Sequence, residues 1–192
     1  MTTTRRSGHS DLAPRLPLPA WKNRVLAIAG GAIVAALVGV GLTMPAAAAH
    51  SKHHSKAHTV TAAPVYKEFA KAGLPVSGLI VYTAATDPNH LLGRPNGYTS
   101  KCAWVDSRVP TSDTSGDPAG DVDFGGSVEV FPTAAGAKAR AKEILTDEKA
   151  EPILGSEYDY LAGGVLVRIS QYLTPTQAAS YGKAEKAKLY KG

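Results

Sequence analysis

The feature that most constrains this chain is an apolar run from Val25 to Met44, twenty residues long and without a charged side chain. A helix of that length rises about 30 Å, which matches the hydrocarbon thickness of a bilayer. We therefore interpret the run as an export or transmembrane helix. The residues that follow it are then interpreted as a part of the protein that is carried across a membrane.

Two outcomes share this topology. Basic residues cluster on the N-terminal side of the run, so the N-terminus is expected to stay cytoplasmic and the following domain to lie outside. Pro45 and the alanines after it favour cleavage after Ala49, as in a secretory signal. The length of the run favours an uncleaved single-pass anchor. The protein is predicted to be extracytoplasmic, either secreted or attached to the cell membrane through this helix.

The charge of the chain is divided unevenly along its length. Residues 1–49 carry five basic residues and one acidic residue, whereas residues 60–192 carry 14 basic and 15 acidic residues. The formal net charge of +5 therefore comes from the basic residues before the apolar run, which indicate membrane topology. The domain itself is close to neutral, so we predict no nucleic-acid partner. We divide the chain into a basic cytoplasmic region (1–24), the export segment (25–49), a His-rich flexible linker (50–62) and one extracytoplasmic domain (63–192).

The linker contains four histidines within nine residues, together with lysines and serines. Such a composition cannot form a core, so a solvated tether is the simplest interpretation. Neutral imidazole also binds Zn²⁺ and Cu²⁺, which makes metal binding in the cell envelope an alternative function. The candidate ligands are His50, His53, His54 and His58. No other cofactor is predicted.

The domain is predicted to have an α+β fold. Helix starts are indicated by Pro64, by Thr133 and by the capping box that begins at Thr174. Ala162-Gly163-Gly164 predicts a hairpin. The expected helices span 65–72, 133–146 and 175–190, and the expected strands span 79–84, 99–106, 127–131, 158–161 and 165–170.

Their order predicts a mostly antiparallel sheet of about five strands with helices packed on one face. The 79–84 strand is apolar and β-branched, so we expect it to be buried. Arg140 is placed on the water-facing side of its helix.

One loop combines turn formers with polar side chains. Turn-forming residues flank Leu91 and Leu92, which indicates an ordered loop over residues 86–98. We predict that it binds a small molecule, a glycan or a protein, and that Arg94 grips a carboxylate or phosphate with two hydrogen bonds. The alternative is a purely structural loop in which Arg94 pairs with Asp87 or caps carbonyl groups. The candidate ligand-binding residues are Asn89, His90, Arg94 and Lys101.

Catalytic signatures are absent from the sequence: it has no Gly-x-Ser-x-Gly, no His-Glu-x-x-His, no phosphate loop and a single cysteine. Cys102 is predicted to be a buried small side chain. We place Glu157 and Asp159 on opposite faces of a strand, so they are not expected to form a glycosidase-like pair. A non-enzymatic binding or interaction domain is the leading prediction, and a small secreted enzyme using the loop around His90 is an alternative.

Three segments resemble those of small exported proteins common in high-GC Gram-positive bacteria. They are TDPNHLLGRPNGYTSK (86–101), GGSVEVF (125–131) and YDYLAGGVLVRISQYLTPTQAASY (158–181). The resemblance implies an actinobacterial protein with an extracytoplasmic α+β domain. It brings no catalytic residues with it.

Overall fold

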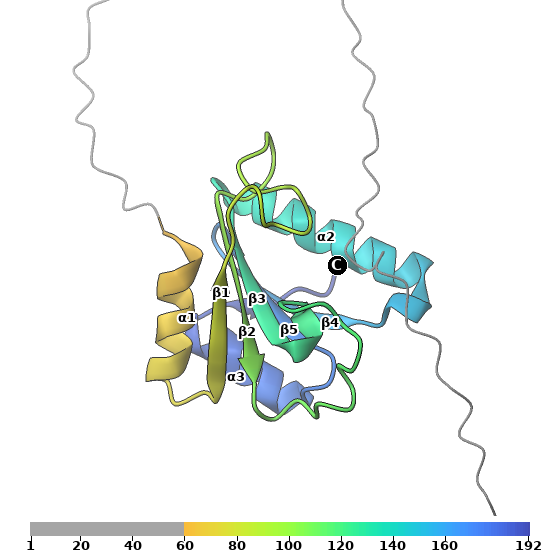
Figure 1. Cartoon of the computed structure of the whole chain (residues 1–192). Helices are drawn as coiled ribbons and strands as arrows, with labels where there is room; N and C mark the ends of the chain where they lie inside the picture. The colour runs from red at the N-terminus through yellow and green to blue at the C-terminus, as the bar shows by residue number, and fades with distance from the viewer. Residues whose placement is uncertain (1–59) are drawn as a thin grey trace, which may run out of the picture.

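A six-stranded antiparallel sheet runs through residues 60–192, which are the residues that the computed structural model describes (Figure 1). Its strands are β1 (Val76–Val81), β2 (Ser100–Asp106), β3 (Gly125–Val130), β4 (Glu157–Ala162), β5 (Val165–Ser170) and β6 (Lys188–Leu189). The helices are α1 (Ala62–Lys71), α2 (Ala134–Ala150) and α3 (Pro175–Ala184), with 3-10 turns η2 (Val122–Phe124) and η3 (Pro152–Leu154).

The strands lie in the order β1-β2-β3-β5-β4-β6, and every pair of neighbours is antiparallel. The predicted α+β class and antiparallel sheet are confirmed, with one strand more than expected. The predicted export segment, its cleavage site and the histidine tract all lie outside the described residues.

Local sequence signals set the starts of two helices, as predicted. The Thr133 hydroxyl accepts a hydrogen bond from the Gly136 N–H at the start of α2. At α3 the Thr174 hydroxyl accepts from the Gln177 N–H, and the Gln177 side chain accepts from the Thr174 N–H, which completes the capping box. Helix α3 ends at Ala184 and not near Tyr190, because the chain turns back and pairs as β6 with β4.

Strand β1 differs from the expected buried strand at 79–84. It spans Val76–Val81 and forms one edge of the sheet, with Leu79 37% and Val81 55% exposed. A bulge interrupts its pairing with β2 between Ser77 and Ile80, where Gly78 has a φ of +60°. Apolar composition marks a strand but does not distinguish an edge position from a central one, which is why the burial prediction was wrong.

The face of the sheet that carries α1 and α3 is mostly apolar, and we call it the apolar face. Its exception is the buried carboxylate of Asp106, which accepts a hydrogen bond from the Tyr181 hydroxyl at 2.6 Å and pairs with Arg108. Trp104 of β2 packs against Phe69 of α1 and Tyr181 of α3, with ring centroids 5.2 and 5.6 Å away. Gly182 belongs to this packing, because a Cβ at that position would lie 2.5 Å from the Tyr160 ring. Cys102 lies on the same face and is fully buried, and burial raises the pKa of its thiol to about 12. The prediction for Cys102 is therefore confirmed.

Helix α2 covers the opposite face, and Figure 1 shows α1 and α2 on the two sides of the strands. Leu166 alternates along β5 with Val165 and Val167, and it packs against Ala137 and Ala141 of α2. The expectation that all helices pack on one face is therefore wrong. Every residue of β3 is buried, so the centre of the sheet needs cover on both sides.

Candidate functional site

Charged side chains extend across four adjacent strands beneath α2, on what we call the charged face. They belong to Lys101 of β2, Glu129 of β3, Arg168 of β5, and Glu157 and Asp159 of β4. The register places Lys101 opposite Glu129, and Arg168 opposite Asp159. Each strand contributes every second residue to this face, which brings residues far apart in sequence into one layer.

Glu129 is the centre of this layer and is fully buried. Its carboxylate lies 3.2 Å from Arg168 Nη1, 3.4 Å from Arg140 Nε and 3.8 Å from Lys101 Nζ. Burial alone would raise the pKa of Glu129, but the positive charges of Arg140, Arg168 and Lys101 outweigh it and hold the pKa below its usual value. Arg140 was expected to face water, and it is only 6% exposed because it reaches down from α2 to Glu129.

Arg168 continues the network to β4. Its Nε and Nη2 atoms donate to the two oxygens of Glu157 at 2.6 and 2.7 Å, a two-pronged ion pair. Asp159 shares this side of β4, because residues two apart on a strand point the same way. The expectation that Glu157 and Asp159 diverge is therefore wrong. Burial and the charge of Glu157 raise the pKa of Asp159 well above its usual value.

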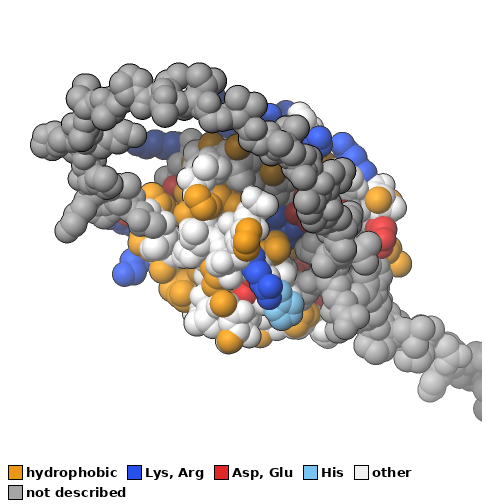
Figure 2. Space-filling view, turned by 90° about the horizontal axis from the view of Figure 1, so that it is seen from above, with side chains coloured by type: hydrophobic (Ala, Val, Ile, Leu, Met, Phe, Trp, Pro, Cys, Tyr) orange, Lys and Arg blue, Asp and Glu red, His pale blue; other side chains and the backbone are white. Residues whose placement is uncertain are grey.

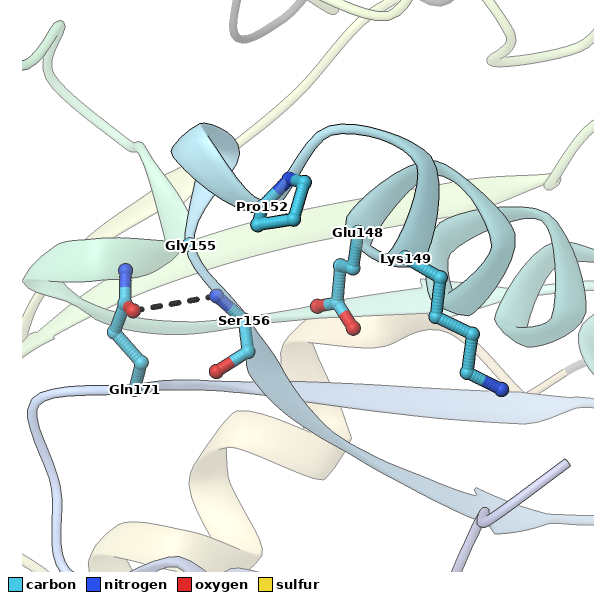
Figure 3. Close-up of a pocket in the computed structure, with 6 residues that line it drawn as sticks. All are labelled: Glu148, Lys149, Pro152, Gly155, Ser156 and Gln171. Carbon is cyan, nitrogen blue, oxygen red and sulfur yellow. Dashed lines mark hydrogen bonds between the residues drawn. The ribbon is translucent and has the colours of Figure 1, made fainter.

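A pocket of about 400 Å³ lies where α2 ends beside β4 (Figure 3). Its lining residues are Glu148, Lys149, Pro152, Gly155, Ser156 and Gln171. Figure 3 shows the Glu148 carboxylate on the side of the Ser156 segment, with the Lys149 side chain extending the other way. Burial and the charge of Glu157 raise the pKa of Glu148 to about 7. Among the lining residues no hydrogen bond joins a nucleophile to a base, so this geometry gives no support to catalysis.

The 86–99 loop is organised around the buried carboxylate of Asp87, which is 1% exposed. One oxygen of Asp87 accepts hydrogen bonds from the N–H groups of Leu91 and Leu92 at 2.9 and 3.0 Å. The Tyr98 hydroxyl donates to the same carboxylate at 2.7 Å, and Lys101 Nζ donates to it at 3.2 Å. Burial raises the pKa of Asp87, but the Tyr98 hydrogen bond and the Lys101 charge together prevail and lower it.

The structure separates the predicted ligand-binding residues into two pairs. Lys101 is 4% exposed and Asn89 donates to Glu129 at 3.4 Å, so both belong to the internal network. His90 and Arg94 are exposed on the outside of the loop. Figure 2 looks down on this end of the molecule and shows a histidine side chain beside a Lys or Arg side chain. The ordered loop was predicted, but its four polar side chains do not converge.

Sequence reasoning missed the residues that hold the loop in place. The sequence predicts Asp87 as a turn former and a possible partner for Arg94 or His90, and it places Glu129 within the strand 127–131. A signal was present, because Lys101, Glu129 and Arg168 each interrupt an apolar strand at a position that alternation assigns to one face. The sequence alone does not show that these three positions face one another.

Two further findings apply to residues 60–192 only. No group of three or more His, Cys, Asp or Glu side chains is arranged there to bind a metal ion. None of the helices in that range has the length and apolar character that crossing a bilayer requires. The predicted metal ligands and the predicted membrane segment lie outside this range.

The chain matches no protein-family model, no curated protein and no solved structure. The charged face and the loop are therefore interpreted from their own geometry.

Proposed function

We propose that residues 60–192 form an extracytoplasmic, non-enzymatic binding domain whose ligand surface is the outer side of the 86–99 loop. The observation that carries this proposal is the buried Asp87 carboxylate, which holds the loop backbone at Leu91 and Leu92. A loop fixed in this way presents His90 and Arg94 from a rigid backbone. Binding to such a loop costs little ordering entropy.

The energetics of the buried charges support this role. Lys101, Asp87 and Glu129 are all removed from water, and buried ion pairs of this kind are often no more stabilising than apolar side chains of similar volume. A network that adds little net stability still specifies one arrangement of the chain, and here it specifies the conformation of the 86–99 loop. We infer that the role of these charges is to fix the conformation of the 86–99 loop.

The exposed side chains define the chemistry of the ligand. The guanidinium of Arg94 matches a carboxylate or a phosphate with two parallel hydrogen bonds. His90 adds a second group able to hydrogen-bond a sugar or an anion. The ligand is therefore a small molecule, glycan or protein segment that carries an anionic group. The export segment at 25–44 accounts for the placement of such a domain outside the cell or on the membrane.

The test is a titration followed residue by residue by NMR, with inorganic phosphate, citrate and glucuronic acid as probes. We expect at least one anion to shift the amide signals of residues 88–97, and we expect Arg94→Ala to abolish that shift. The matched control is Lys138→Ala, which removes an exposed cation from α2 and leaves the titration unchanged. Equal shifts in Arg94→Ala and in the original protein would contradict the proposal.

A further inference from the structure

The ion pair between Lys101 and Asp87 is almost completely shielded from solvent. Lys101 Nζ lies 3.2 Å from Asp87 Oδ1, and the two side chains are 4% and 0% exposed. The rings of Tyr82 and Tyr98 flank the nitrogen, with their centroids 5.1 and 5.4 Å away. An amine and a carboxyl group are thus held together in a site that bulk water does not reach.

The surroundings of Asp87 match what an acyl-transfer reaction requires. Oδ2 accepts two backbone hydrogen bonds, from Leu91 at 2.9 Å and from Leu92 at 3.0 Å. Two N–H groups on one oxygen are the arrangement that stabilises the oxyanion of a tetrahedral intermediate. Lys101 contacts the other oxygen, Oδ1, and the Tyr98 hydroxyl lies 2.7 Å from both oxygens.

Groups that move protons lie next to the nitrogen. Glu129 Oε1 is 3.8 Å from Nζ, and the Tyr98 hydroxyl oxygen is 3.4 Å from Nζ and 2.7 Å from Oδ1. Burial lowers the pKa of Lys101, and it prevails over the negative charges of Glu129 and Asp87, which act in the opposite direction. The neutral amine, which is the nucleophilic form, is therefore easier to reach than in a lysine exposed to water.

We propose that Lys101 and Asp87 condense within the folded chain to form an amide, an intramolecular isopeptide crosslink between β2 and the 86–99 loop. The crosslink joins residues 14 positions apart and fixes the loop covalently. It does not depend on any ligand of the loop, so it stands independently of the proposed binding function.

The reaction balances without an external reagent. Glu129 takes one proton from the Lys101 ammonium and passes it to Oδ1 of Asp87, which gives a neutral amine and a neutral carboxylic acid. Nζ attacks Cγ of this acid to form the new C–N bond, and the negative charge from the C=O bond collects on Oδ2. A second proton passes from Nζ through the Tyr98 hydroxyl to Oδ1. The C–Oδ1 bond breaks and Oδ1 leaves as water, with both of its protons derived from Nζ.

The residue after Asp87 makes the reaction easy to detect. Pro88 has no backbone N–H, so the Asp87 carboxyl cannot lose water by cyclising onto its own chain. A loss of water at Asp87 therefore reports a bond to another side chain.

The test is the intact mass of the protein under denaturing conditions, recovered from the medium or from membranes in detergent. We expect a mass lower by one water molecule than that of the sequence counted from its observed N-terminus. Digestion with trypsin locates the bond, because an amidated Lys101 is not cleaved and the Arg94–Pro95 bond resists trypsin. The crosslinked protein gives one peptide covering 72–108, also one water lighter, in place of separate peptides 72–101 and 102–108.

Substitutions test the roles of Lys101 as the nucleophile and Glu129 as the proton acceptor. Lys101→Arg keeps the positive charge but cannot form the amide, and Glu129→Gln removes the proton acceptor, so both should show the full mass. Glu151→Gln, the same change at an exposed carboxylate just after α2, should keep the water loss. The full mass in the original protein, or cleavage after Lys101 in its digest, would overturn the proposal even if both network variants fail to fold.

Discussion

The two faces of the central sheet are buried by different chemistry. On the apolar face, Trp104, Phe69 and Tyr181 pack ring against ring between the sheet and helices α1 and α3. On the charged face, Glu129 and Arg168 lie at the centre of an ion network beneath α2. Dispersion and the hydrophobic effect are non-directional, so the apolar face supplies stability and tolerates small displacements. Ion pairs and hydrogen bonds are directional, so the charged face specifies where the loop and α2 lie.

Among the described residues, the charged face has more buried polar atoms without a hydrogen-bond partner than the apolar face, where Trp104 Nε1 is one. Ser127 Oγ and Asp159 Oδ1 are buried without a hydrogen-bond partner among the described residues, and they belong to the strands on either side of Arg168. Unpaired buried polar atoms cost free energy. This domain therefore keeps a polar layer that costs free energy beside an apolar layer that stabilises it, and the polar layer contains the residues on which both proposals rest.

Removing a ring from the apolar face should have the largest effect. We expect Phe69→Ala to lower the free energy of unfolding by about 3–5 kcal/mol, because it leaves a cavity between Trp104 and Tyr181. Urea denaturation measures the change. The loss should be nearly the same at pH 4 and pH 8, since no ion pair is broken. A matched control is Leu79→Ala on the exposed edge strand, for which a change below about 1 kcal/mol is expected.

Breaking the charged face should cost slightly less and should depend on pH. We expect Arg168→Met to lower the free energy of unfolding by about 3 kcal/mol at pH 7, because Glu157 loses its two-pronged partner and Glu129 loses one of its three cations. The pKa of Glu129 is lower in the folded protein than in the unfolded chain, where a glutamate has a pKa of about 4.3. Its ionised form therefore stabilises the fold at pH values above about 4.3. That contribution disappears as the pH falls through the folded pKa.

The difference between Arg168→Met and the original protein should therefore shrink on acidification below about pH 4. Denaturation curves at several pH values provide the measurement. A loss independent of pH, like that of Phe69→Ala, would show that Arg168 acts by packing alone and would remove the distinction between the two faces.

The smallest effect is expected at the pocket beside β4. The pKa of Glu148 is raised to about 7, so Glu148 favours the folded state below its unfolded pKa of about 4.3. That contribution is lost as the pH rises through 7. We expect Glu148→Gln to be more stable than the original protein at pH 8 by about 1 kcal/mol, allowing for solvent screening, and to show no such gain at pH 4. Thermal unfolding measures it, with the exposed Glu151→Gln as control. A gain of equal size at both pH values would contradict the raised pKa of Glu148 as the cause.

Local signals predicted much of the fold. Thr133 and Thr174 begin helices where expected, and Ala162-Gly163-Gly164 joins β4 to β5 as a hairpin. The order of elements predicted the antiparallel α+β class. These features depend on residues within a few positions of one another, so a single sequence contains the information that they require.

The candidate site was predicted only in part. An ordered loop over residues 86–98 was predicted from its turn formers, and His90 and Arg94 are on its surface. Lys101 was assigned to the same surface, but the fold places it inside. The reason is that β2 directs Lys101 toward Glu129, which lies on a strand more than twenty residues away in the sequence.

The sequence by itself determined the apolar segment at 25–44, the starts of α2 and α3, the β4–β5 hairpin and the approximate positions of strands β2 to β5. Only the tertiary structure decided which strand lies at the edge, that helices cover both faces, and that Asp87, Lys101, Glu129 and Arg168 form one buried network. Alternation tells which residues of a strand share a face, but strand order and register decide which strands are neighbours. Those follow from the packing of the whole domain, and the charges therefore find their partners only when the sheet is assembled.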